Sequence, residues 1–131
     1  MKIFGVGTDI VNTERFNKSF KLYTRNFKKR IFTIGEIAYC DKKKNNVAAY
    51  AKRFAAKEAF TKALGTGFRK GISFKNISVI NDKNGKPSIK LSGKVKNYLK
   101  KKIKSNKYSI HLSLSDDRPW AQATVIISYN K

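Results

Sequence analysis

Two acidic residues, Asp9 and Glu58, stand in stretches of sequence that are otherwise largely apolar. Two carboxylates that meet can hold a magnesium ion, because this ion prefers oxygen ligands and completes its octahedral shell with water and phosphate oxygens. Lys62 follows Glu58 at the spacing of one helical turn and would bring an ammonium group, suited to a phosphate, to the same place. These residue types point to phosphate chemistry, although the sequence alone does not show that Asp9 and Glu58 meet.

Glu58 and Lys62 belong to the segment FAAKEAFTKALGTG, residues 54–67. They continue the helix face that carries Val47 and Phe54, so they stand where the buried stripe of the helix should run on. One interpretation is an exposed glutamate–lysine pair, worth about a few tenths of a kcal/mol. The other is a partly buried carboxylate held for a metal, with the lysine beside it for a phosphate.

Asp9 lies near the end of a strand predicted over residues 3–11, IFGVGTDIV. Alternation along a strand places Gly5, Gly7 and Asp9 on one face, together with Ile3 and Val11. The opposite face holds Phe4, Val6, Thr8 and Ile10. Glycines weaken a strand and leave bare backbone beside Asp9. The alternative for Asp9 is the frequent one of an aspartate that caps the following helix.

Other polar residues allow two interpretations each. Gly65 and Gly67 follow the helix directly, and glycine lets the backbone approach a ligand. Arg53 and Lys57 lie on a flank of the same helix, where they either add positive charge beside Glu58 or are solvated surface residues. His111 is the only histidine, and a lone histidine is more often structural than catalytic. Its place on the serine face of a strand would nevertheless let it donate a hydrogen bond to a phosphate.

The elements that must position these residues can be predicted from capping, periodicity and turn signals. The longest helix is expected over residues 46–64, which are rich in alanine and free of glycine and proline, with Gly65 as its C-cap. Asn12 or Thr13 is expected to cap a helix, and Asn-Gly in residues 81–87 marks a hairpin turn. The remaining predicted elements are helices over residues 14–20, 24–32, 35–43 and 93–104, the last capped by Ser92, and strands over 77–81, 88–91, 108–115 and 120–128, with a turn at 116–119. This pattern predicts one α+β domain over residues 1–131, with a mainly antiparallel sheet packed on a long central helix.

The composition limits the class of protein. The chain has 131 residues, of which 30 are lysine or arginine and 8 are acidic, for a net charge of +22. Such a charge attracts polyanions or an acidic protein partner. The single cysteine, Cys40, excludes an intramolecular disulfide and a thiolate zinc cluster. No apolar stretch approaches the roughly 18 residues of a membrane helix, and the first residues do not read as a signal peptide. We therefore expect a cytoplasmic protein without a membrane partner.

Four stretches of the sequence resemble the holo-(acyl-carrier-protein) synthases, the small 4′-phosphopantetheinyl transferases of bacterial fatty acid synthesis. GVGTDIVNTERF, residues 5–16, is similar to the opening motif of that family. RFAAKEAFTKALGTG, residues 53–67, is similar to its central signature almost residue for residue. NDKNGKP, residues 81–87, and ATVIIS, residues 123–128, resemble its hairpin and last strand. The resemblance spans essentially the whole chain, and the central signature is its most specific part.

The resemblance implies a magnesium-dependent transfer of 4′-phosphopantetheine from coenzyme A to a serine of an apo acyl carrier protein, with release of adenosine 3′,5′-bisphosphate. It makes Asp9 and Glu58 the metal ligands and Lys62 a contact to the coenzyme phosphates. Arg53 and His111 become further phosphate or nucleotide contacts. The acceptor of the serine proton is either Glu58 or a metal-bound water, and the sequence does not decide between them.

The same resemblance implies further contacts and an assembly. Arg15 and Arg25 match the helix that receives the acidic carrier protein. A homotrimer with active sites between its subunits is also implied. The expected border of the coenzyme site consists of short, mostly glycine-containing segments, at Gly65, Gly67, Gly85, Lys86 and Pro87.

Two observations stand beside this interpretation. Many members of the family have a histidine where this chain has Asp116, so that position is left out of the expected site. The charge of +22 also suggests a nucleic-acid-binding protein. The chain shows no recognition motif of that class, such as an RRM-type aromatic motif or a zinc finger, so no specific nucleic-acid partner is expected.

Overall fold

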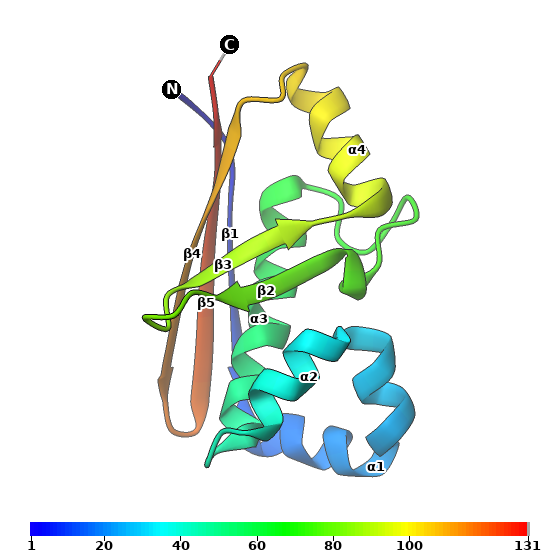
Figure 1. The fold of residues 1–131 in the computed structure, drawn as a ribbon, viewed down its shortest axis with the longest axis vertical. Helices are drawn as coiled ribbons and strands as arrows, with labels where there is room; N and C mark the ends of the chain where they lie inside the picture. Colours follow the sequence, from blue (N-terminus) through cyan, green and yellow to red (C-terminus); the bar gives the residue numbers. More distant parts are fainter. Residues whose placement is uncertain (131) are drawn as a thin grey trace.

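The computed structural model describes residues 1–130, and for residues 22–25 it describes the helical backbone only (Figure 1). The elements follow the chain in the order β1 (Lys2–Asn12), α1 (Thr13–Ile31), α2 (Ile34–Asp41), α3 (Asn46–Leu64), a short 3-10 helix η1 (Phe74–Asn76), β2 (Ile77–Asn81), β3 (Pro87–Leu91), α4 (Gly93–Ile103), β4 (Tyr108–Asp117) and β5 (Trp120–Tyr129). Three long strands form an antiparallel sheet in the order β1-β5-β4, and β2 and β3 form a separate antiparallel pair. The predicted α+β class with a mainly antiparallel sheet is confirmed.

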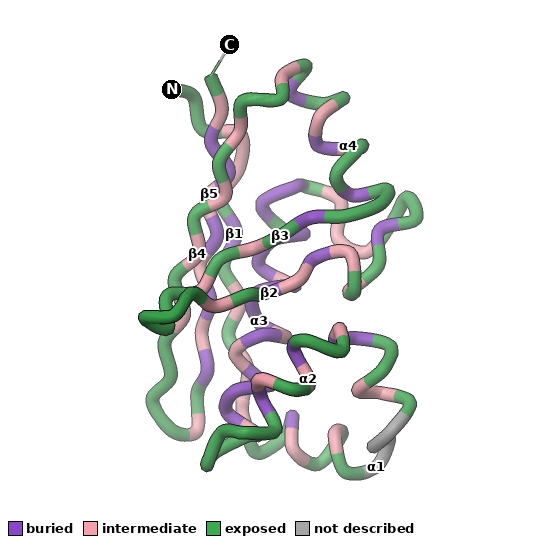
Figure 2. Tube along the Cα trace, in the orientation of Figure 1, coloured by how far each residue is buried: buried purple, intermediate pink, exposed green. Residues whose placement is uncertain are grey.

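The central helix α3 has the bounds that the sequence predicted. The side chain of Asn45 caps its start by accepting a hydrogen bond from the backbone N–H of Ala48 at 3.2 Å. Gly65 ends it with a left-handed φ of 89°, a conformation that glycine adopts without a steric penalty. Between these caps lie residues of high helix propensity, most of them buried (Figure 2).

The main core lies between α3 and one face of the three-stranded sheet. Ala121, Ala123, Val125 and Ile127 alternate along β5 toward α3, and all four are fully buried. The hairpin β2-β3 and helix α4 close this core on the side away from the sheet (Figure 1). A second cluster of buried residues, rich in aromatic side chains, joins α1, α2 and the first half of α3.

The other face of the three-stranded sheet is exposed and carries several apolar side chains. Ile3, Val6, Ile10 and Trp120 are 54%, 60%, 61% and 43% exposed. In Figure 1 the helices all lie on the opposite side of the sheet. None of the described helices is long and apolar enough to cross a membrane.

Strand β1 differs from the predicted alternation at its start. A register shift between Ile3 and Gly5 leaves Phe4 as an extra residue, the mark of a β-bulge. The bulge turns Phe4 into the main core and leaves Ile3 exposed, so the prediction for these two residues was wrong. From Gly5 onward the predicted faces are correct, because the period of two resumes after the bulge.

Three further details depart from the prediction. The two helices expected over residues 14–20 and 24–32 are one continuous helix, α1. Ser92 stands at the start of α4 but makes no capping hydrogen bond; its hydroxyl accepts one from the side chain of Asn76 at 3.3 Å. Strand β4 extends through Asp116 and Asp117, so the turn to β5 is shorter than the predicted turn over residues 116–119.

Candidate active site

Gly5 and Gly7 let β1 lie directly against the backbone of α3. A Cβ atom on Gly7 would lie 1.9 Å from the carbonyl oxygen of Ala59, and one on Gly5 would lie 1.8 Å from that of Ala63. Helix backbone cannot rotate out of the way as a side chain can, so only glycine fits at both positions. Asp9 is the next residue on this face of β1, and the close approach brings it to the part of α3 that carries Phe54 and Glu58.

Asp9, Glu58 and Lys62 form one polar cluster at the contact between β1 and α3. The Lys62 ammonium donates to Oδ1 of Asp9 at 3.1 Å and to the carbonyl oxygen of Thr8 at 3.0 Å. Asp9 and Glu58 line the same cleft of about 510 Å³. The predicted convergence of the two carboxylates, which the sequence left undecided, is therefore present in the structure.

The ordinary alternatives for these residues do not describe the structure. The helix that follows β1 is capped by Asn12, whose side-chain oxygen accepts from the backbone N–H of Glu14 at 3.0 Å. Asp9 is thus not the cap. The ammonium of Lys62 lies on Asp9, and the hydrogen bonds and ion pairs of the described residues include no Glu58–Lys62 pair.

The two carboxylates influence each other electrostatically. Burial raises the pKa of Glu58 above its ordinary value, and the nearby charge of Asp9 raises it further, while Lys62 acts in the opposite direction. A carboxyl group that is half-buried beside a second carboxylate resists losing its proton. A cation placed between the two would relieve this repulsion.

The donor set fits magnesium rather than a metal held by the protein alone. No group of three or more metal-binding side chains occurs among the described residues. Mg²⁺ is commonly bound through one or two carboxylates, with substrate phosphates and water as its remaining ligands. Asp9 and Glu58 supply two carboxylates, and the exposed side chain of Lys62 is free to leave Asp9 for a phosphate.

The cleft continues from the carboxylates onto helix α1. Arg15 lies on its border, beside the aromatic side chains of Phe16, Phe27 and Phe54. Arg15 itself is exposed. The cleft therefore offers a cation and an apolar floor next to the two acids. Arg25, the other predicted carrier-protein contact, lies among the residues whose side chains are outside the described part of the structure.

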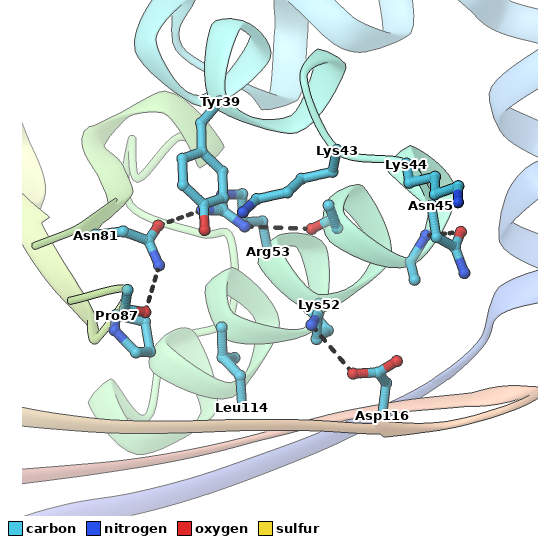
Figure 3. Close-up of a pocket in the computed structure, with 13 residues that line it drawn as sticks. Tyr39, Lys43, Lys44, Asn45, Lys52, Arg53, Asn81, Pro87, Leu114 and Asp116 are labelled. Carbon is cyan, nitrogen blue, oxygen red and sulfur yellow. Dashed lines mark hydrogen bonds and ion pairs between the residues drawn. The ribbon is translucent and has the colours of Figure 1, made fainter. Parts of the chain in front are cut away.

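A second cavity, which we call the Arg53 pocket, lies between the first half of α3, helix α2, the β2-β3 turn and the end of β4 (Figure 3). Its volume is about 390 Å³. Arg53, Gly85 and Pro87, which the sequence analysis grouped around the coenzyme, all line it. The pocket and the Asp9–Glu58 cleft have no lining residue in common.

Arg53 is held rigidly inside this pocket. Its guanidinium lies 4.2 Å from the ring centre of Tyr39 and donates to the side-chain oxygen of Asn81. Asn81 in turn donates to the carbonyl oxygen of Gly85 at 3.0 Å, which ties the β2-β3 turn to Arg53. Arg53 is only 3% exposed, and its Nε is a buried donor that has no partner among the described residues.

Several residues of the Arg53 pocket were missed by the sequence analysis. The pocket is lined by further polar side chains, namely Tyr39, Lys43, Lys44, Asn45, Lys52, Asn81 and Asp116. Lys43 and Lys44 belong to a lysine run that precedes α3, and only the run itself was a signal in the sequence. Asp116 was excluded from the expected site, yet it lies in the pocket wall with Lys52 (Figure 3).

Lys57 is neither a surface residue nor a member of either cavity. It is fully buried, and its ammonium donates to Glu36 at 2.6 Å and to the carbonyl oxygens of Ile31 and Phe74 at 2.8 and 3.0 Å. The other carboxylate oxygen of Glu36 accepts from the backbone N–H of Val79 at 3.1 Å. This buried pair joins the end of α1, helix α2, η1 and β2 to α3. Lys57 is therefore neither a positive charge beside Glu58 nor a solvated surface residue, the two alternatives that the sequence left open.

The remaining predicted residues are spread around these two sites. Gly65 and Gly67 both have left-handed φ values, 89° and 59°, directly after α3. Lys86 is exposed in the β2-β3 turn. His111 lies on the face of the sheet away from α3, 3.1 Å from the hydroxyl of Ser128. It lines neither of the two cavities, and its predicted phosphate contact stays a prediction.

Comparison with known proteins shows which family this fold belongs to. A family model described as the 4′-phosphopantetheinyl transferase superfamily matches residues 5–124. The chain belongs to this family, which confirms both the expected fold and the family resemblance seen in the sequence.

Within this family the chain is similar to holo-(acyl-carrier-protein) synthases. The protein of that name from Pelagibacter ubique is 49% identical over 127 residues, which cover 97% of this chain and 98% of the relative. The crystal structure of the Neisseria meningitidis enzyme matches with a TM-score of 0.86 and 36% identity, covering 96% of this chain and 98% of the other. A Bacillus anthracis enzyme, solved in complex with CoA (3′,5′-ADP), matches with a TM-score of 0.79 and 33% identity, covering 99% and 100% of the two chains.

Proposed function

We propose that this chain transfers 4′-phosphopantetheine from coenzyme A to a serine hydroxyl of an apo acyl carrier protein, for fatty acid biosynthesis in the cytoplasm. The observation that carries the proposal is that Asp9 and Glu58 line one cleft, with Lys62 donating to Asp9, in a chain of the phosphopantetheinyl transferase family. The second product is adenosine 3′,5′-bisphosphate, because the bond that breaks lies within the diphosphate of the coenzyme.

Asp9 and Glu58 would hold Mg²⁺, and their mutual repulsion in its absence supports this assignment. A bound Mg²⁺ neutralises the charge that develops on a diphosphate as it is cleaved. Lys62 gives up Asp9 and donates to the diphosphate, so its charge acts on oxygens that gain negative charge in the transition state.

The two halves of coenzyme A would occupy two different cavities. The diphosphate belongs with Asp9, Glu58 and Lys62, and the nucleotide end suits the cations of the Arg53 pocket. Since the cavities share no residue, one chain offers each half of the site separately. This separation supports a homotrimer in which the cleft of one copy and the Arg53 pocket of the next form a single site.

The exposed sheet face supports the same assembly. Val6, Ile10 and Trp120 leave apolar surface in water on the side of the sheet that no described helix covers. Burying such surface between copies is favourable by about 25 cal/mol for each square ångström. Because the face includes β1, which also carries Asp9, contact through it would bring a second chain close to the cleft.

The carrier protein would approach along α1. Arg15 borders the cleft, and the exposed residues of α1 near it include Lys18 and Lys21. An acidic carrier would be attracted to this surface, with an on-rate that falls as salt rises. The aromatic floor of the cleft would then receive apolar side chains of the carrier.

A mass-spectrometric assay tests the proposal. Apo acyl carrier protein incubated with coenzyme A, Mg²⁺ and this protein should gain the mass of one phosphopantetheine group. Addition of EDTA should prevent the gain. The Glu58→Ala variant should fold and remain inactive, whereas Asp117→Asn, which removes an exposed acid outside the cleft, should remain active. Full activity of Glu58→Ala would remove Glu58 from the reaction.

A further inference from the structure

The Arg53 pocket contains a carboxylate that an anion-binding cavity does not need. Four cationic side chains line the pocket, Lys43, Lys44, Lys52 and Arg53. Asp116, at the end of β4, is its one acidic lining residue. Figure 3 shows Asp116 pointing up from the strand toward the pocket floor formed by α3.

Asp116 is paired with one of these cations. Its Oδ1 lies 3.1 Å from the ammonium of Lys52, and both side chains are partly exposed, at 43% and 29%. The pair as a whole carries no net charge, so it attracts an anionic ligand less strongly than an unpaired lysine would. Arg53 differs, because it is held by Tyr39 and the neutral Asn81 and keeps its charge available.

We infer that Asp116 is a specificity-determining residue that limits how tightly the Arg53 pocket binds a phosphate monoester. The inference rests on the proposed function, which assigns the diphosphate of coenzyme A to the Asp9–Glu58 cleft. The phosphate that remains is the 3′-phosphate of the ribose, a dianion in neutral solution. In the Arg53 pocket this phosphate is attracted by the positive charges of Arg53 and the lysines, and the negative charge of Asp116 weakens that attraction.

The limit that Asp116 sets on phosphate affinity would help the reaction to release its product. Adenosine 3′,5′-bisphosphate keeps the 3′-phosphate after transfer, so whatever binds that group in the substrate also binds it in the product. A pocket with all four cations uncompensated would hold the product as tightly as the substrate. Asp116 therefore weakens both, and it speeds product departure at the cost of some substrate affinity.

The test is calorimetric binding of adenosine 3′,5′-bisphosphate and of adenosine 5′-monophosphate, which lacks the 3′-phosphate, to the purified protein. Asp116→Asn should lower the Kd of the bisphosphate by roughly threefold to tenfold, the size expected for one partly screened charge near a dianion. The Kd of the monophosphate should change much less. Inhibition of the transferase by added bisphosphate should become correspondingly stronger.

Further variants test whether Asp116 weakens bisphosphate binding through its charge or strengthens it by orienting Lys52. Lys52→Met leaves Asp116 uncompensated and should weaken bisphosphate binding, whereas Lys52→Met with Asp116→Asn should return it close to the wild-type value, because the pair as a whole is neutral. Asp117→Asn is the matched control: it removes the same charge from the next residue of β4, which lines neither cavity, and should leave the Kd unchanged.

The opposite result would overturn the inference. Weaker bisphosphate binding by Asp116→Asn would show that Asp116 supports the site by orienting Lys52. An equal gain in Asp117→Asn would show that only the overall charge matters. Transferase activity of the wild-type protein is measured in parallel, so that these outcomes in an active enzyme count against the inference alone, and an inactive wild type counts against the proposed function.

Discussion

The buried pair of Lys57 and Glu36 gives the sharpest prediction for stability. Substitution of Lys57 by methionine fills much of the same volume but removes the ammonium that donates to Glu36 and to the carbonyl oxygens of Ile31 and Phe74. Glu36 is then left as a carboxylate that is 2% exposed, with only the backbone N–H groups of Thr33 and Val79 as donors.

The size of the effect follows from this burial. Breaking a buried ion pair by removal of one partner costs about 3–5 kcal/mol, because the remaining charge is uncompensated. A domain of this size is stable by about 5–15 kcal/mol. Lys57→Met should therefore lose a large part of the total. Lys57→Met combined with Glu36→Gln should recover much of the loss, since the amide is neutral and its oxygen still accepts from a backbone N–H.

Urea unfolding followed by circular dichroism measures both variants against the wild type. Lys101→Met, on the exposed surface of α4, is the matched control and should change the free energy of unfolding by less than about 0.5 kcal/mol. A loss below about 1 kcal/mol for Lys57→Met would refute the reasoning. So would a double variant that is no more stable than the single one, because the penalty would then not come from the unpaired charge of Glu36.

Three further predictions concern the site and the assembly. Gly7→Ala should lower the free energy of unfolding by about 1–3 kcal/mol or more and reduce transferase activity, because the added Cβ must push β1 away from Ala59. Gly35→Ala is the control, because a Cβ there would have no atom closer than 4.0 Å. Equal urea unfolding curves for the two variants would contradict the close contact at Gly7. Magnesium should raise the melting temperature, and the increase should grow as the pH rises through the elevated pKa of Glu58, because the ion displaces the proton of Glu58. Glu58→Gln should abolish this pH dependence. An increase in melting temperature that grows toward acid pH would contradict this reasoning. Val6→Lys should dissociate the proposed trimer in sedimentation experiments, and an unchanged assembly would place the interface elsewhere.

Those parts of the fold that local signals determine were predictable from the sequence. The bounds of α3 were predicted from the alanine-rich run and from Gly65, which act within one or two helical turns. The β2-β3 hairpin follows from the Asn-Gly turn between two short strands. The bulge that exchanges Ile3 and Phe4 was not predictable, because it depends on how β1 pairs with β5 at the far end of the chain.

The candidate site was only partly predictable. Gly5 and Gly7 indicated a close backbone approach near Asp9, but which element approaches is set by tertiary packing. Arg53 and Lys57 lie on a flank of the helix by periodicity alone, and they are buried because α2 and the hairpin pack over that flank. The family resemblance supplied the roles of Asp9 and Glu58 before any contact was known; their assignment as metal ligands stays a prediction.

The division of the site into two cavities has a genetic consequence. If each catalytic unit joins the cleft of one chain to the Arg53 pocket of another, a defect in either cavity disables a different half of that unit. A chain with Glu58→Ala and a chain with Arg53→Ala would each be inactive alone. Expressed together in one cell, they would form mixed assemblies in which some units combine two intact halves, so two damaged copies of the gene would complement each other.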